Sequence, residues 1–284
     1  MYSIKKINPF IISLCIILLI ALIFSLPINK LFSEDYFSEF QIEYIVLALK
    51  MLSLFSIGFV GIKKIDMLSL SGISSKHKWS FKWLNLTPIY LFIIGVLSFI
   101  GKDIFLVDSS NVFLLLVACL MVGFAEEFIF RGFILPLFIK KYQHHKKGIF
   151  LSILFSALFF GFSHFINLSV NDNIPQVIAQ VVFAVFMGIF FGAVLLKTNK
   201  LLPIAITHGL INFFFLFGTL PAISDDVDIT NTAQSLSDQI SGATPAIIIF
   251  FPLLIVGLIV SKKINREMIL KKLPAQSFQK VIQL

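Results

Sequence analysis

Charged residues are scarce in this chain of 284 residues, where they make up 13%, against roughly 25% in ordinary soluble domains. Hydrophobic residues make up 58%, and 34 residues are phenylalanine. So little charge and so much apolar surface are incompatible with a soluble globular fold. The composition therefore predicts a polytopic membrane protein.

Cysteine is also nearly absent, since the chain has only Cys15 and Cys119. Two cysteines that both fall in long apolar stretches provide neither a disulfide framework nor a zinc knuckle. A free thiol in such surroundings behaves as a small apolar residue. We expect both cysteines to be structural.

Long apolar runs are abundant. A helix needs about 20 apolar residues to cross a bilayer, and the sequence predicts an all-α, polytopic transmembrane bundle of about eight helices. Without an internal repeat or a long linker, we expect one integrated membrane domain, divided into N-terminal helices with a basic loop (1–109), a core (110–220), and an outer loop, last helix and basic tail (221–284). The predicted spans are 8–28, 43–62, 84–101, 111–139, 148–168, 174–196, 201–220 and 244–261.

Lysine and arginine are concentrated in alternate loops. Cytoplasmic loops of membrane proteins carry an excess of these residues, so we expect the basic loops and both termini to be cytoplasmic. The net charge of +8 then reflects contact with anionic lipid headgroups better than it reflects nucleic-acid binding. The basic segments are 63–82, 140–147, 197–200 and 262–272.

Glu126, Glu127 and Arg131 lie inside the fourth predicted span. A charge at membrane depth costs roughly 2.5 kcal/mol or more, and such residues usually face a protein interior or a water-filled cavity. Residues four apart share a helix face, so Glu127 and Arg131 are expected to pair while Glu126 faces a cavity as a general base. The alternative is a buried charge network that only fixes helix packing.

Three more polar residues lie in apolar spans: His164 in the fifth, and His208 and Asn212 in the seventh. Each histidine alone is more typical of a packed core residue. Together with Glu126 on three different helices, however, the set suits peptide-bond hydrolysis, in which a base activates water and buried donors stabilise the oxyanion. We expect Glu126 and His164 to activate water, and His208 and Asn212 to hold the oxyanion.

A zinc ion is the other option, because two histidines and one carboxylate can hold zinc with water in the fourth position. Glu126, His164 and His208 would be the ligands. The sequence has no His-Glu-x-x-His helix, so it leaves both a divalent metal and a metal-free mechanism open.

These motifs resemble those of the CPBP intramembrane proteases, the CAAX protease and bacteriocin-processing (Abi) family. The matching segments are Glu126-Glu127-x-x-x-Arg131, Phe160-x-x-x-His164 and His208-x-x-x-Asn212, within about residues 110–220. The resemblance implies an endopeptidase whose first glutamate and first histidine activate water, with the second histidine and the asparagine at the oxyanion. It also implies a peptide or membrane-protein substrate and either a metal-dependent or a glutamate-dependent mechanism.

The depths of the two histidines do not match in straight spans. At 1.5 Å per residue, His208 lies about 10 Å from the start of its span and His164 about 24 Å from residue 148. Either the fifth span begins in the cytosol or tilts strongly, or the two spans meet in a deep cavity.

The leading interpretation is an intramembrane endopeptidase in a bacterial plasma membrane, with its site open to the cytoplasmic side. The bacterial assignment follows the phenylalanine-rich, lysine-using composition, and the resemblance adds peptide processing or bacteriocin immunity. A non-catalytic membrane scaffold is a second hypothesis. A proton-coupled transporter is a third, because intramembrane glutamates and histidines also relay protons.

Overall fold

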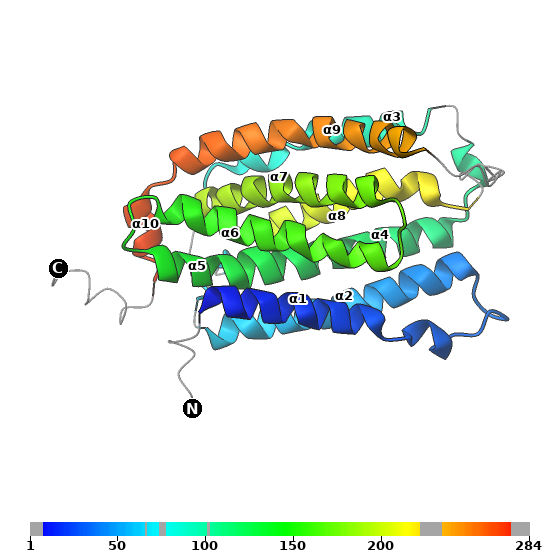
Figure 1. The fold of residues 1–284 in the computed structure, drawn as a ribbon, viewed down its shortest axis with the longest axis horizontal. Helices are drawn as coiled ribbons and strands as arrows, with labels where there is room; N and C mark the ends of the chain where they lie inside the picture. The colour runs from blue at the N-terminus through cyan, green and yellow to red at the C-terminus, as the bar shows by residue number, and fades with distance from the viewer. Residues whose placement is uncertain (1–7, 66, 74–77, 101–102, 222–234, 274–284) are drawn as a thin grey trace.

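The structure is a computed structural model that describes residues 8–65, 67–73, 78–100, 103–221 and 235–273, and all regular secondary structure in these ranges is helical (Figure 1). Short 3-10 turns lie at 28–31, 82–86, 104–106, 164–169 and 217–219, and a π-helix, η5, at Glu127–Ile134. The α-helices are α1 Pro9–Ser25, α2 Glu39–Lys64, α3 Ile89–Leu97, α4 Ser109–Glu126, α5 Leu135–Tyr142, α6 Gly148–Ser163, α7 Ile174–Thr198, α8 Leu202–Leu216, α9 Leu236–Lys262 and α10 Arg266–Leu270.

Local chemistry explains several helix starts. Ser38 and Gln41 form a capping box at the start of α2, which satisfies two free backbone donors. The Asp108 carboxylate accepts a hydrogen bond of 2.8 Å from the Ser110 backbone amide at the start of α4, and this bond holds the pKa of Asp108 below its ordinary value. α7 and α8 each have proline in their first turn, where its missing amide proton costs little.

Seven helical segments of the described chain are long and apolar enough to cross a bilayer, which makes this an integral membrane protein and confirms the predicted fold class. Seven of the eight predicted spans correspond to these segments. The segment predicted at 84–101 is shorter: η3 and α3 together cover Lys82–Leu97. Pro88 separates its two parts, since proline cannot donate the backbone hydrogen bond that a continuous helix requires.

The outer loop is also shorter than predicted at its C-terminal end. α9 begins at Leu236, where Ser235 caps it through the Asp238 backbone amide, and not near residue 244. Residues 222–234 of the predicted loop lie outside the described residues.

The start of α1 and the short helix α10 lie at the same end of the bundle, at the left in Figure 1. The basic connections meet there: the Lys197 ammonium donates to the Lys263 carbonyl, and the Arg266 guanidinium donates to the Gln143 carbonyl. We call this the basic end, and the other the acidic end, where α4 and α9 begin.

The turn between α7 and α8 is buried beneath residues 67–73 at the basic end. Thr198 and Leu201 are completely buried, and the Leu201 amide donates to the Gly72 carbonyl at 3.1 Å. α8 therefore begins beneath a cover of protein and not at the surface of the bundle. This explains why His208, near the start of α8, lies at the same cavity as His164, at the end of α6.

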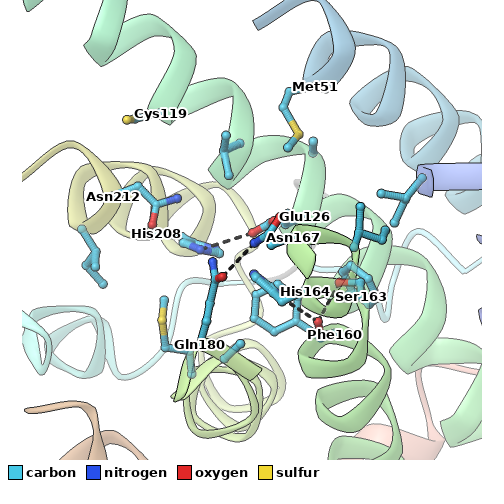
Figure 2. A pocket seen from close by; sticks show the side chains of 18 of the residues that line it. Met51, Cys119, Glu126, Phe160, Ser163, His164, Asn167, Gln180, His208 and Asn212 are labelled. Carbon is cyan, nitrogen blue, oxygen red and sulfur yellow. Dashed lines mark hydrogen bonds and ion pairs between the residues drawn. The ribbon is translucent and has the colours of Figure 1, made fainter. Parts of the chain in front are cut away.

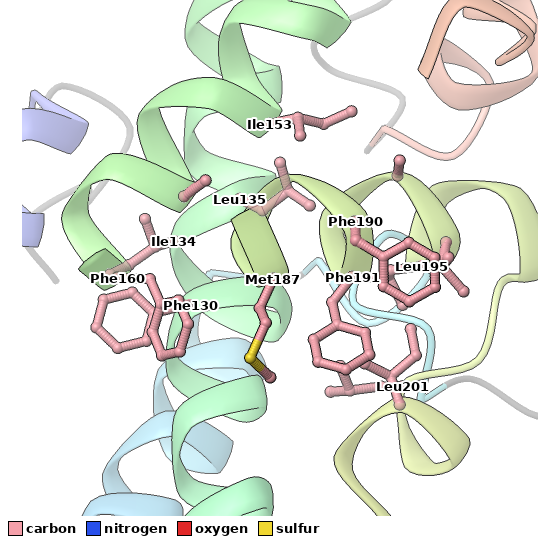
Figure 3. Packing of buried hydrophobic residues seen from close by; sticks show 14 of the residues in the cluster. Phe130, Ile134, Leu135, Ile153, Phe160, Met187, Phe190, Phe191, Leu195 and Leu201 are labelled. Atoms are coloured by element: carbon pink, nitrogen blue, oxygen red, sulfur yellow. The ribbon is translucent and has the colours of Figure 1, made fainter. Parts of the chain in front are cut away.

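Large apolar side chains of η5, α6 and α7 pack together in one cluster (Figure 3). Phe138, Phe190, Phe191 and Leu201 are all at most 1% exposed and belong to one continuous core. The polar site adjoins this core, since the Phe191 ring lies 5.6 Å from the His208 ring.

Candidate active site

Four charged or titratable side chains form a continuous chain at the centre of the bundle. Arg131 Nη1 lies 3.0 Å from Glu127 Oε1, as the four-residue spacing predicts. The same carboxylate oxygen lies 2.8 Å from His208 Nδ1, and His208 Nε2 lies 3.4 Å from Glu126 Oε2. Carboxylates therefore face both nitrogens of the imidazole.

The two glutamates differ in exposure. The side chain of Glu127 is 0% exposed, whereas that of Glu126 is 17% exposed and lines a cavity. As predicted, Glu127 is buried in an ion pair and Glu126 faces a cavity. The sequence did not reveal that both carboxylates also lie next to His208. That contact joins residues 81 positions apart, and no local pattern reports it.

A change of helix type lies between the glutamates. α4 ends at Glu126 and the π-helix η5 begins at Glu127. Pro136 follows this segment, and a proline inside a helix lacks a donor and clashes with the carbonyl four residues before it, which accounts for the wider turn. The Ser156 hydroxyl donates to the Phe130 carbonyl at 2.7 Å inside this turn. π-turns within α-helices are frequent at functional sites.

α4 and α8 approach closely beside this cluster. A Cβ atom on Gly123 would lie 2.4 Å from the Ala205 carbonyl oxygen, and one on Gly209 would lie 2.8 Å from the Leu120 Cα. Small residues let membrane helices pack with backbones in contact. Gly123 and Gly209 thus bring Glu126 on α4 within reach of His208 on α8.

The cavity has a volume of about 440 Å³, and it is mostly apolar (Figure 2). This size and character are typical of small-molecule or peptide sites. Met51, Phe183 and Phe215 contribute to its apolar wall. Its polar lining includes Glu126, His164, Asn167, Gln180, His208 and Asn212, so the structure gathers the predicted residues Glu126, His164, His208 and Asn212 around one space.

His164 has a defined tautomer. Its Nδ1 lies 2.9 Å from the Phe160 carbonyl oxygen, and because a carbonyl can only accept, Nδ1 carries the proton. In the neutral ring Nε2 is then an acceptor. His164 can therefore accept a proton or a hydrogen bond through Nε2.

Phe160 is a residue whose position sequence reasoning left unexplained. Its ring centroid lies 4.1 Å from the Arg131 guanidinium carbon, 4.9 Å from the His164 ring and 5.9 Å from the His208 ring. Phe160 thus packs between both histidines and the buried cation. Its four-residue spacing to His164 was the available signal.

The predicted metal ligands do not form a metal centre. Within the ranges that the structure describes, no three side chains of histidine, cysteine, aspartate or glutamate are grouped closely enough to hold a metal ion. His208 directs both ring nitrogens at carboxylates, although it was predicted to bind the metal together with Glu126 and His164. This arrangement does not fit zinc coordination.

The cavity has a defined place along the helices. Its lining includes residues 160–167, 180–187 and 208–216, which belong to the halves of α6, α7 and α8 nearest the acidic end. The sequence predicted a site open to the cytoplasmic side, and that side of access stays a prediction.

These features define an integral membrane protein with a buried carboxylate–histidine site inside its helical bundle. Residues 108–214 match the family model described as Type II CAAX prenyl endopeptidase Rce1-like. The matched segment contains all three motifs, and its description agrees with the family that those motifs resemble. Neither the curated proteins nor the solved structures yielded a match to the chain.

Proposed function

We propose that this protein is an intramembrane endopeptidase that hydrolyses a peptide bond at the cavity around Glu126. The observation that carries the proposal is the convergence of Glu126, His164, His208 and Asn212 from three helical segments on one apolar cavity, inside a segment that matches a protease family. A scaffold would not require a polar set gathered in a cavity.

Glu126 is the proposed general base. Its Oε2 atom is buried and, among the described residues, has no hydrogen-bond partner, although His208 Nε2 lies 3.4 Å away. A carboxylate in this position has lone pairs free for a water molecule. His164 Nε2, an acceptor in the neutral ring, is the second group that can orient that water.

His208 and Asn212 are the proposed oxyanion donors. When the His208 ring carries both protons, Nδ1 donates to Glu127 and Nε2–H points toward Glu126 and the cavity. The four charges of Arg131, Glu127, His208 and Glu126 then balance, which buried charges require. Preorganised donors in a poorly solvated site are effective at stabilising a developing oxyanion.

The proposed reaction balances through these groups. Water adds to the peptide carbonyl carbon as Glu126 takes its proton, and the carbonyl oxygen becomes the oxyanion. Glu126 then returns a proton to the leaving nitrogen as the carbon–nitrogen bond breaks, and a carboxylate and an amine result.

No step passes through a metal, so we expect cleavage to survive dialysis against a chelator. Loss of cleavage that zinc restores would contradict this route.

The test is cleavage of a fluorogenic peptide library, with lipidated C-terminal peptides included, by purified protein in detergent. We expect Glu126→Gln to lower the rate by about 10²–10⁴-fold, the usual contribution of general acid–base catalysis, and His164→Ala and His208→Ala also to lose activity. Glu43→Gln and His144→Ala change the same residue types at exposed positions and should leave the rate unchanged. Equal rates in the site variants and these controls would overturn the proposal.

A further inference from the structure

Two amide side chains line the cavity and have no part in the proposed hydrolysis. Asn167 Nδ2 donates to Gln180 Oε1 at 2.7 Å, and both residues are half-buried and belong to the lining of the cavity that contains Glu126 (Figure 2). An amide in apolar surroundings is costly unless its polar groups find partners. Packing of apolar helices does not require such a pair.

Each amide comes from an element that already faces the site. Asn167 lies in the 3-10 helix η6, His164–Ser169, in which side chains three residues apart are eclipsed, so Asn167 follows His164 along one face. Gln180 lies on α7, where Ala184 and Met187, further along the same helix face, also line the cavity. Both side chains thus belong to the faces that surround Glu126.

The hydrogen bond between the two amides leaves part of their capacity unused. It takes one donor and one acceptor, and within the ranges that the structure describes neither side chain makes another hydrogen bond. Asn167 Oδ1 remains as an acceptor and Gln180 Nε2 as a donor, and an exchange of O and N in both side chains leaves the same complement. A free acceptor beside a free donor matches a peptide backbone, whose N–H donates and whose carbonyl accepts.

We infer that Asn167 and Gln180 form a subsite that binds the backbone of the substrate peptide near the bond that is hydrolysed. This inference rests on the proposed function, to which it adds substrate-binding residues. Three residues of 3-10 helix rise about 6 Å, which is the length of about two residues of an extended peptide. The subsite therefore holds a peptide group about two residues from the bond beside His164. Because both contacts are to backbone, it selects an extended chain and not a particular side chain.

Amide-to-ester replacement in a peptide tests this pairing, since an ester lacks the N–H that the free acceptor would bind. The probes are a fluorescent peptide of leucine and alanine and a series in which one backbone amide at a time is an ester. Binding is measured in detergent with Glu126→Gln protein, which is expected to hold the peptide without turnover. KM and kcat are measured with protein that keeps Glu126. Asn167→Ala and Gln180→Leu are introduced separately into both proteins.

The chain offers a matched control close to this pair. Asn171 Nδ2 donates to Gln176 Oε1 at 3.3 Å, and Gln176, like Gln180, lies on α7. Neither Asn171 nor Gln176 is among the described residues that line the cavity. Gln176→Leu removes this second amide bond and should change neither binding nor KM.

We expect one ester position to weaken binding and raise KM by about 3- to 10-fold, the range for one hydrogen bond, with a smaller effect on kcat. The all-amide peptide should bind Asn167→Ala and Gln180→Leu more weakly by a similar factor. The sensitive ester should have no further effect in the variant that removes the acceptor.

A pair that only fastens η6 to α7 would give a different result. Its loss would weaken all peptides alike and leave the effect of every ester unchanged, and that outcome would overturn the inference, as would a peptide that binds none of the proteins. The expected binding pattern without cleavage by wild type would overturn the proposed function and leave the subsite standing. Cleavage without that pattern would do the opposite.

Discussion

Arg131 is the residue on which the buried charge network depends. It is 1% exposed and is the cationic partner of Glu127, which is 0% exposed and also holds His208. A buried ion pair is not in itself a large source of stability, but removal of one partner leaves an uncompensated charge.

We expect Arg131→Met to lower the free energy of unfolding by about 3–5 kcal/mol, because it leaves the Glu127 carboxylate buried without its cation. Reversible unfolding in mixed micelles measures this change. The double variant Glu127→Gln/Arg131→Met should recover part of the loss, since no unpaired carboxylate remains. Lys146→Met removes an exposed cation and should have little effect. An Arg131→Met protein as stable as the wild type would contradict the pairing.

Much of this residue-level arrangement could be predicted from sequence. Four-residue spacing predicts the pair of Glu127 with Arg131 because it lies within one helix. The bond from His208 to Glu127 could not be predicted, because it depends on which face of α8 meets α4. The tautomer of His164 follows from the Phe160 carbonyl, which only the three-dimensional arrangement places at Nδ1.

At the scale of elements, the crossing of α4 and α8 sets the distance between Glu126 and His208. Gly123 lies at this crossing, where an added Cβ would meet the backbone of Ala205 and Gly209. A methyl group against backbone cannot be relieved by a side-chain rotation, so the helices themselves must separate.

We expect Gly123→Ala to lower the cleavage rate of folded protein by about 10²-fold, the effect of a displacement of about 1 Å at a reacting group. Gly257→Ala is the matched control, because its Cβ would lie 2.8 Å from the Phe190 Cα at a different crossing. That variant should lose stability by a similar amount, about 1–3 kcal/mol, yet keep its rate per folded molecule. Parallel losses of rate in the two variants would show that the α4–α8 crossing has no special role.

Elements were predicted well where hydrophobicity alone decides them, as for α2, α6 and α7. α3 was overestimated because its apolar composition continues past Leu97 while its helix does not. The π-helix at Glu127–Ile134 was not predicted, because its apolar residues fit an ordinary α-helix and only Pro136 indicates the irregularity.

At the scale of the whole molecule, segment 67–73 closes the basic end over the α7–α8 turn. Gly72 has φ of +74°, a backbone conformation that costs residues other than glycine about 1–2 kcal/mol. An added Cβ would also lie 2.5 Å from Leu195 Cδ1 and 3.0 Å from the Leu201 amide nitrogen. This position therefore requires glycine for both reasons.

We expect Gly72→Ala to lower the free energy of unfolding by at least about 1 kcal/mol, and to leave the cleavage rate per folded molecule close to that of the wild type, since the segment lies away from the cavity. Thermal unfolding in detergent measures the first quantity and peptide cleavage the second. Gly242→Ala, whose Cβ would meet nothing within 4 Å, serves as control. A Gly72→Ala protein of unchanged stability would show that the cover contributes little.

The sequence correctly predicted the membrane fold, and the segment that carries its motifs matches the family that they resemble. It did not predict where along the helices the cavity lies, because loop charge contains no information on which part of the bundle is filled. Side chains such as Phe190 and Leu201 close one half, whereas near Glu126 the polar residues line an open space, and this difference depends on packing between distant segments.

The most direct measurement is mass spectrometry of the cleavage product formed in heavy-oxygen water by wild type, Glu126→Gln and Glu43→Gln. If Glu126 activates water, the new carboxylate formed by wild type and Glu43→Gln carries one heavy oxygen, and Glu126→Gln yields almost no product. Equal product from Glu126→Gln, or a new terminus without heavy oxygen, would contradict peptide hydrolysis at this site.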